Sequence, residues 1–428
     1  MSVLSGLEPK VVWAHFEDIC QVPRPSKKEE KIIEFLLDFG KKLNLETQRD
    51  EIGNVLIKKP GTLGKENLKT VVLQSHMDMV CEKNSATEHN FDTDPIIPWI
   101  DGEWVKAKGT TLGADDGIGV AAEMALLSST DIEHGPIECL FTVDEETGLS
   151  GAFALQPGFV SGDILLNLDS EDEGEIFLGC AGGIDTLATM SYTREDIPAG
   201  YFAVRLDVNK ILNRFLWEIN KKYDVRLADF SGGNLRNAIP REASAVVVIP
   251  SKFKEQIRID LNLYAAEMEN VWAISEPKLK LELESTDMPA FVCDKATSNN
   301  LFDALYACPH GVFTMSTRMP GMVETSNNLA SVKFIDGDKI FITTSQRSDV
   351  DSEKYNIAQN VGVAFTMAGA EIVHSDGYPG WAPNPESNIL KVAVKSYERL
   401  FNVEPIARSI HAGLECGLFL EKYPNMDM

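Results

Sequence analysis

Three segments of this chain share one pattern, in which a short apolar run ends in acidic residues. They are TVVLQSHMD (70–78), IECLFTVDEE (137–146) and DILLNLDSED (163–172). Each is typical of a buried strand, and a helical segment, GVAAEMALLSS (119–129), separates the first two. Strands that alternate with helices predict an α/β fold on a parallel or mixed sheet. Because ligands collect at the carboxyl ends of such strands, we expect the acidic residues to share one site.

The second half of the chain has a different pattern of expected strands and helices. Long alternating strands such as KIFITTSQRS (339–348) are separated by helical stretches, which predicts an α+β domain inserted into the first. A Pro/Gly-rich stretch, GYPGWAPNPES (377–387), marks the expected return to the first domain. The expected parts are a catalytic domain over 1–184 and 386–428, and an inserted lid domain over 185–385.

The composition narrows the class of protein. The chain has 428 residues, enough for two domains, and a formal net charge of −25. This charge argues against nucleic acid or an anionic membrane as a partner, because both would be repelled. No stretch is apolar enough to span a bilayer, and the seven cysteines, without a C-x-x-C pair, fit a reducing compartment. We therefore expect a cytoplasmic protein.

His76 and Asp78 end the first of the three strands. Side chains two residues apart on a strand point the same way, so both can address one site. An imidazole can bind a metal ion while a neighbouring carboxylate orients it. The H-x-D triplet alone is a weak signal, because short motifs often occur by chance.

Asp115 and Asp116 lie in a glycine-rich segment, TLGADDGIGVAAE, that opens a helix. Taken alone, this pair is interpreted as a helix N-cap. The functional alternative is that one carboxylate bridges two metal ions, with one oxygen on each. Gly113 and Gly117 would then allow the turn that directs this carboxylate.

Glu145, Glu146 and Asp169 complete the acidic set. The two glutamates are expected in extended chain, where adjacent side chains diverge, so one can ligate a metal while the other acts as general base. Asp169 would supply a further oxygen ligand. The alternatives are an exposed acidic turn for the glutamates and an ordinary turn cap for Asp169. Together with a histidine, these carboxylates are the ligand set of a hydrolytic zinc or manganese pair.

The motifs SHMDMV, GADDGIG, TVDEETG and NLDSEDEGEIFLGCAGG resemble those of the M20 metallopeptidases. They are most similar to the aminoacyl-histidine dipeptidase branch, often called peptidase D. The resemblance continues through LRNAIPREA, TTSQRSDVDS, GYPGWAPNP and IHAGLECGLF. It implies a zinc-peptidase catalytic domain with a lid, two zinc ions with cobalt or manganese as substitutes, and Xaa-His dipeptides such as carnosine as favoured substrates.

Carried over residue by residue, the resemblance implies a role for each acidic residue. His76 and Asp169 would bind one zinc ion and Glu146 the other. Asp115 would bridge the two ions, at what is a cis Asp-Asp bond in the family. Asp78 would orient His76.

The resemblance also implies the catalytic base and the substrate contacts. Glu145 would be the general base for a metal-activated water. Asn237, Arg347 and the backbone around Gly413 resemble the family's contacts to the substrate carboxylate and oxyanion. An arginine suits a carboxylate because its planar fork binds two oxygens at once, and the alternative for Arg347 is a surface strand residue.

Two parts of the family pattern are not found in this sequence. The family has a further metal-ligating histidine in a G-x-H-S-P-D-E-like segment, and this chain ends at KYPNMDM before one. It also has a G-G-H-S-G loop in the lid, expected after VRLDV, where Asn209 is followed directly by Lys210. Either the sequence omits segments of a longer protein, which the intact surrounding motifs favour, or the protein is a shortened and inactive relative.

Three functions stay open at this point. The first is hydrolysis of dipeptides, with a small peptide as the partner and a homodimer left open. The second is hydrolysis of N-acyl amino acids, because the same metal pair serves both bonds. The third is peptide binding without catalysis.

Overall fold

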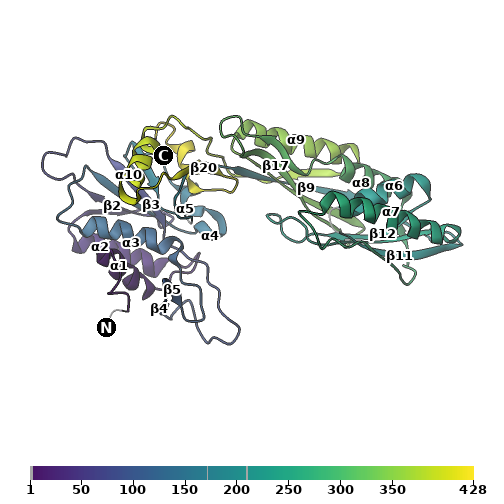
Figure 1. Cartoon of the computed structure of the whole chain (residues 1–428), viewed down its shortest axis with the longest axis horizontal. Helices are drawn as coiled ribbons and strands as arrows, with labels where there is room; N and C mark the ends of the chain where they lie inside the picture. The colour runs from purple at the N-terminus through teal and green to yellow at the C-terminus, as the bar shows by residue number, and fades with distance from the viewer. Residues whose placement is uncertain (1–2, 171, 209–210) are drawn as a thin grey trace. The chain divides into compact units, whose positions relative to one another are not determined.

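The structure is a computed structural model that describes residues 3–170, 172–208 and 211–428 (Figure 1). The junction of Asn209 and Lys210, where the family's lid loop is expected, lies outside the described residues. The chain divides into two compact units. Unit 1 comprises Met1–Cys180, Trp381–Ile410 and Leu414–Met428, and unit 2 comprises Ala181–Gly380 and His411–Gly413. The roles expected for the parts, a catalytic domain and a lid, stay predictions.

Unit 1 is built around a five-stranded sheet. Its helices are α1 (Lys10–Cys20), α2 (Glu30–Lys42), α3 (Ala114–Ser128), α4 (Glu145–Gly148), α5 (Ser150–Ala154), α10 (Asn388–Phe401) and α11 (Glu415–Lys422). Its strands are β1 (Glu46–Arg49), β2 (Val55–Lys59), β3 (Val71–His76), β4 (Pro98–Asp101), β5 (Trp104–Ala107), β6 (Ile137–Thr142), β7 (Ile164–Asn167), β8 (Glu175–Cys180) and β20 (Ile406–Ile410).

The main sheet has the strand order β1-β2-β6-β3-β7. β3 is parallel to both β6 and β7, whereas β1, β2 and β6 pair antiparallel, so the sheet is mixed as the sequence predicts. Every residue of β6 is buried, and so are five of the six residues of β3. A strand covered on both faces needs a nearly continuous apolar run, which explains the pattern in the sequence.

Alternate residues of these strands face two separate cores. On one face, Leu73 and Phe141 pack with residues of α1, α2 and α3, including Phe16, Leu36 and Met124. On the other face, Val72 and Leu140 pack with residues of α5 and α11, including Phe419. This sandwich of helices around a central sheet is the expected α/β arrangement.

Unit 2 is an antiparallel sheet covered by helices. Its strands are β9 (Gly182–Ser191), β10 (Arg194–Glu195), β11 (Tyr201–Val208), β12 (Arg226–Gly232), β13 (Ala243–Pro250), β14 (Glu282–Ser285), β15 (Val292–Cys293), β16 (Gly311–Met315), β17 (Val323–Ile335), β18 (Lys339–Ser348) and β19 (Glu371–His374). Its helices are α6 (Leu212–Lys222), α7 (Lys254–Trp272), α8 (Lys295–Ala307) and α9 (Asp351–Met367).

The large sheet of unit 2 has the order β14-β11-β13-β12-β17-β18-β9-β19, and β16 pairs with β17. Its core joins alternate strand residues, such as Val247 and Ile342, to Phe215 of α6, Phe302 of α8 and Phe365 of α9. Antiparallel strands with helices on one face form an α+β unit, which confirms the fold class expected for the second half. Among the described residues, no helix has both the length and the apolar character that a bilayer span requires.

Candidate metal centre

The ends of three parallel strands lie side by side in unit 1. His76, the last residue of β3, pairs with Thr142, the last residue of β6. Gln74 of β3 pairs with Asn167, the last residue of β7, and Asp169 follows two residues later. The topology therefore brings the residues after these strands to one edge of the sheet.

The imidazole of His76 is buried, with carboxylates at both of its nitrogens. Its Nε2 lies 2.9 Å from Asp115 Oδ1 and 3.8 Å from Asp169 Oδ1. Its Nδ1 lies 3.2 Å from Asp78 Oδ1. Burial lowers the pKa of His76, but the carboxylates of Asp115 and Asp78 outweigh it and raise the pKa well above its usual range. One nitrogen thus faces the acidic cluster, and the other faces a carboxylate that can fix the ring.

Asp78 connects the end of β3 to the start of α4. Its carboxylate accepts hydrogen bonds from Ser26 Oγ at 2.7 Å, from the Glu145 amide at 3.1 Å and from the Glu146 amide at 3.4 Å. Burial raises the pKa of Asp78, but His76, the Ser26 hydroxyl and the Glu145 amide together lower it more, and the net pKa is below its usual value. An ionised, fully bonded Asp78 therefore holds both His76 and the following glutamates.

The two aspartates at the start of α3 have different surroundings, one typical of a helix cap and the other facing His76. Asp116 is buried and its Oδ1 accepts a hydrogen bond from the Gly119 amide at 3.2 Å, as a capping residue does. Asp115 is half-exposed and faces His76. The bond between them is cis, and the preceding Gly113 has φ +68°, a conformation that glycine adopts without strain.

Glu145 and Glu146 do not lie in extended chain, so that expectation is wrong. β6 ends at Thr142, and Asp144, at φ 51°, turns the backbone into the first turn of α4. The Thr147 hydroxyl donates to Asp144 and stabilises this turn. Successive side chains on a helix are about 100° apart, so the two glutamates still diverge.

These residues fit a metal ion. Ligand atoms of His76, Asp115 and Glu146 all lie within 4.8 Å of one another, and Asp169 reaches the same imidazole nitrogen. Burial raises the pKa of Glu145 to about 7, and it also raises the pKa of Glu146 and Asp169. Gathered carboxylates of this kind repel one another unless a cation neutralises them. One imidazole with several carboxylates is a donor set that zinc accepts.

The raised pKa values predict how the metal-free protein responds to pH. Burial raises the pKa of Glu145 from 4.5 to about 7, and that of Asp116 from 3.8 to about 7. Between the unfolded-state and folded-state pKa values of each group, the folded protein binds more protons than the unfolded protein. The contribution of Glu145 and Asp116 to stability is therefore complete below about pH 4 and is lost as the pH rises through about 7. In the presence of a metal chelator, the free energy of unfolding in urea should fall less between about pH 5.5 and about pH 7.5 in Glu145→Gln than in the unchanged protein. Equal losses in both proteins would contradict this assignment.

Arg24 supports the site, and the sequence analysis missed it. Its side chain is buried, and Nη1 donates to the carbonyl oxygens of Met77 at 3.1 Å and Asp78 at 2.7 Å. Nη2 donates to the carbonyl oxygen of Gly113. A Cβ at Gly117 would lie 2.6 Å from Nη2, so that glycine makes room for the guanidinium. Arg24 therefore ties the strand end that carries His76 to the loop before Asp115.

Replacing Arg24 with methionine is expected to lower the free energy of unfolding by about 3 kcal/mol or more, because three buried carbonyl groups lose their donor. Urea unfolding in the presence of chelator measures this change without a contribution from metal. Arg236→Met is the matched control, since Arg236 is exposed and its ion pair with Asp185 is worth about 1 kcal/mol or less. Equal losses in the two variants would contradict the role given to Arg24.

The three predicted substrate contacts all lie in unit 2. Asn237 is exposed in the loop between β12 and β13. Arg347, in β18, donates from Nη1 to the carbonyl oxygen of His411 at 2.8 Å. Gly413 packs against the Tyr378 ring, where a Cβ would lie 2.7 Å from Cε2. Arg347 and the segment before Gly413 are thus in direct contact within that unit.

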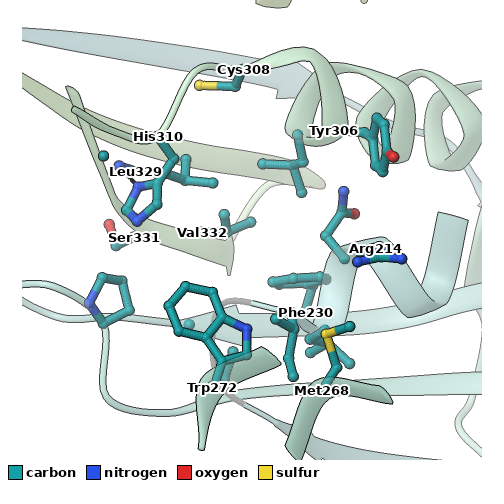
Figure 2. Close-up of a pocket in the computed structure, with 18 of the residues that line it drawn as sticks. Arg214, Phe230, Met268, Trp272, Tyr306, Cys308, His310, Leu329, Ser331 and Val332 are labelled. Carbon is teal, nitrogen blue, oxygen red and sulfur yellow. Dashed lines mark hydrogen bonds between the residues drawn. The ribbon is translucent and has the colours of Figure 1, made fainter. Parts of the chain in front are cut away.

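Unit 2 also contains a cavity of about 520 Å³ (Figure 2). Figure 2 shows Phe230, Met268 and Trp272 among the side chains that surround it. Two of its polar side chains are already engaged: Arg214 pairs with Glu218 and Glu267, and His310 Nδ1 accepts a hydrogen bond from the Leu329 amide. Among the described residues that line this cavity there is no carboxylate, in contrast to the surroundings of His76.

Comparisons with known proteins find similar peptidases. The model of the peptidase family M20/M25/M40 matches residues 72–428. The chain is 42% identical over 447 residues to the cytosol non-specific dipeptidase of Escherichia coli K12, covering 100% of this chain and 92% of that protein. The crystal structure of aminoacylhistidine dipeptidase from Vibrio alginolyticus matches with a TM-score of 0.93 and 43% identity, covering 99% of this chain and 90% of that one. Aminopeptidase PepT from Bacillus cereus shares the fold, with a TM-score of 0.60 and 18% identity over 96% of this chain and 87% of that one.

Proposed function

Because the chain belongs to the peptidase family M20/M25/M40, we propose that it is a metal-dependent dipeptidase that favours Xaa-His dipeptides. The observation that carries this proposal is the convergence of His76, Asp115 and Glu146, whose ligand atoms lie within 4.8 Å of one another. A related protein of Escherichia coli is named a cytosol dipeptidase, and we assign this chain to the same compartment.

The proposed cofactor is a pair of zinc ions, with cobalt or manganese as substitutes. One ion would be held by His76 and Asp169 and the other by Glu146, with Asp115 available to both. When bound, the ions polarise the scissile carbonyl and lower the pKa of water. The carboxylates that surround His76 support this assignment, because each oxygen would gain a cationic partner.

Glu145 is the proposed general base. It accepts a proton from the attacking water and passes it to the leaving amine. In the metal-free site burial raises its pKa to about 7, and the charge of a bound cation would lower that pKa and favour the ionised form that accepts a proton. Asp78 positions this base, because its carboxylate accepts the hydrogen bond from the Glu145 amide and also contacts the His76 ring.

Arg347, Asn237 and the backbone around Gly413 are the proposed substrate contacts. The guanidinium of Arg347 suits the carboxylate of a dipeptide, since its planar fork can bind both oxygens. Its hydrogen bond to the His411 carbonyl leaves further N–H groups on the guanidinium for that purpose.

Hydrolysis assays with carnosine and with an N-acetyl amino acid test the proposed function. We expect carnosine cleavage that is lost on chelation and restored by zinc, with the N-acetyl compound cleaved poorly. Faster cleavage of the N-acetyl compound would make the protein an amidohydrolase of the same family. No zinc in the purified protein and no cleavage of either compound would favour a peptide-binding relative.

A further inference from the structure

Glu415, the first residue of α11, is a buried carboxylate that belongs to no role assigned above. Only 1% of Glu415 is exposed to solvent. Its Oε2 accepts hydrogen bonds from Gln74 Nε2 at 2.6 Å and from Thr142 Oγ1 at 2.9 Å. Among the described residues, no group bonds to its Oε1. Burying such a group is costly, so its contacts must contribute something that an apolar residue would not.

The two donors to Glu415 come from the strand ends that carry the site. Gln74 precedes His76 by two residues on β3, so both side chains point to the same side of the strand. Thr142 is the last residue of β6 and the register partner of His76. Glu415 therefore fixes two neighbouring strands close to the point where each delivers a site residue.

The same network reaches the third strand. Gln74 Oε1 accepts a hydrogen bond from Asn167 Nδ2 at 2.6 Å. Asn167 Oδ1 in turn accepts one from the Asp169 amide at 3.3 Å. The Gln74 amide group can satisfy both neighbours in only one orientation, because its NH₂ must face Glu415 and its oxygen must face Asn167. Glu415 and Asn167 together set that orientation.

We propose that Glu415 is a positioning residue: through Gln74, Thr142 and Asn167, it fixes the ends of β3, β6 and β7 at the separation that the metal ligands require. It acts through these side chains and does not touch the metal or the substrate. The inference rests on the proposed metal site and extends it to a second layer of residues. Outer partners of this kind orient the ligands and tune metal affinity.

Three substitutions separate this role from a general effect on folding. Glu415→Ala removes the acceptor for both donors. Glu415→Gln keeps an oxygen at that place, and burial together with the charge of Glu145 raises the pKa of Glu415 to about 8, so a neutral group is compatible with the site. Thr142→Val removes one donor with little change in shape, and it keeps the test open should Glu415→Ala fail to fold.

Glu138→Ala is the matched control. Glu138 is also a buried glutamate of unit 1, and it lies near the start of β6, at the other end of the strand from Thr142. Its carboxylate accepts hydrogen bonds from the Ser161 amide at 2.7 Å and from the Ser161 hydroxyl at 2.6 Å. Its loss should reduce stability without reaching the site.

The experiment measures zinc affinity by competition with a chromophoric chelator, together with kcat and KM for a dipeptide. Glu415→Ala should weaken zinc binding by about 10–100-fold and lower kcat with little change in KM. Thr142→Val should lower zinc affinity and kcat by less than Glu415→Ala does. Glu415→Gln should keep most of the zinc affinity of the unchanged protein. Glu138→Ala should bind zinc as the unchanged protein does.

Three outcomes would overturn the proposal. They are unchanged zinc affinity in both Glu415→Ala and Thr142→Val, equal losses in Glu415→Gln and Glu415→Ala, or an equal loss in Glu138→Ala. If the unchanged chain binds zinc but cleaves no dipeptide, the proposed function fails, while the comparison of zinc affinities still decides the role of Glu415.

Discussion

Glu145→Gln is expected to lower kcat by about 10³-fold, within the range of about 10²–10⁴-fold that a positioned general base contributes. Glutamine keeps the shape of the side chain but cannot take a proton from water. Zinc content should not change, because Glu145 is outside the assigned ligand set. Steady-state kinetics and metal analysis of the same preparation measure both quantities.

The neighbouring residue provides the control for this prediction. Glu146→Gln should lose zinc affinity, because Glu146 is an assigned ligand whose atoms lie near those of His76 and Asp115. Two adjacent glutamates are thus expected to give different results with the same substitution. Full turnover in Glu145→Gln would refute its role as base, and loss of zinc from that variant would show that it is a ligand.

Asp115→Ala should have the largest effect on metal binding. Asp115 is assigned as the carboxylate shared by both ions, so its loss should weaken zinc binding by more than the about 10–100-fold typical of an outer partner. Asp78→Asn should fall within that range, because Asp78 contacts His76 Nδ1 and not the side of the ring that faces Asp115. Competition titrations with a chelator give both values.

The order of the two effects is the critical result. A greater loss of zinc affinity in Asp78→Asn than in Asp115→Ala would mean that the ion lies on the Nδ1 side of His76. Equal affinity in Asp115→Ala and the unchanged protein would remove Asp115 from the ligand set. Circular dichroism of each variant shows whether the fold is kept.

The mixed sheet of unit 1 could be predicted because its central strands are buried on both faces. Segments 70–78 and 163–172 contain β3 and β7, and each runs into acidic residues as expected. Segment 137–146 was predicted only in part, because the strand ends at Thr142. The turn that follows depends on the left-handed conformation of Asp144, which the apolar pattern does not encode.

Supporting residues such as Arg24 and Glu415 were not predicted, because their partners are far away in the sequence. Arg24 bonds to carbonyl groups more than 50 residues away, and Glu415 bonds to Gln74 across 341 positions. One feature of the sequence did indicate Glu415: it is the charged residue within the otherwise apolar run LECGLFL. Charged residues are rarely buried unless they are paired, so such a residue marks a polar network inside the fold.

The most direct test of the account is anomalous diffraction at the zinc edge from crystals grown with zinc. We expect two peaks about 3.5–4 Å apart, bounded by His76, Asp115, Glu146 and Asp169. A peak confined to the other carboxylate group, formed by Glu29, Asp78 and Asp144, or no peak in unit 1, would contradict it.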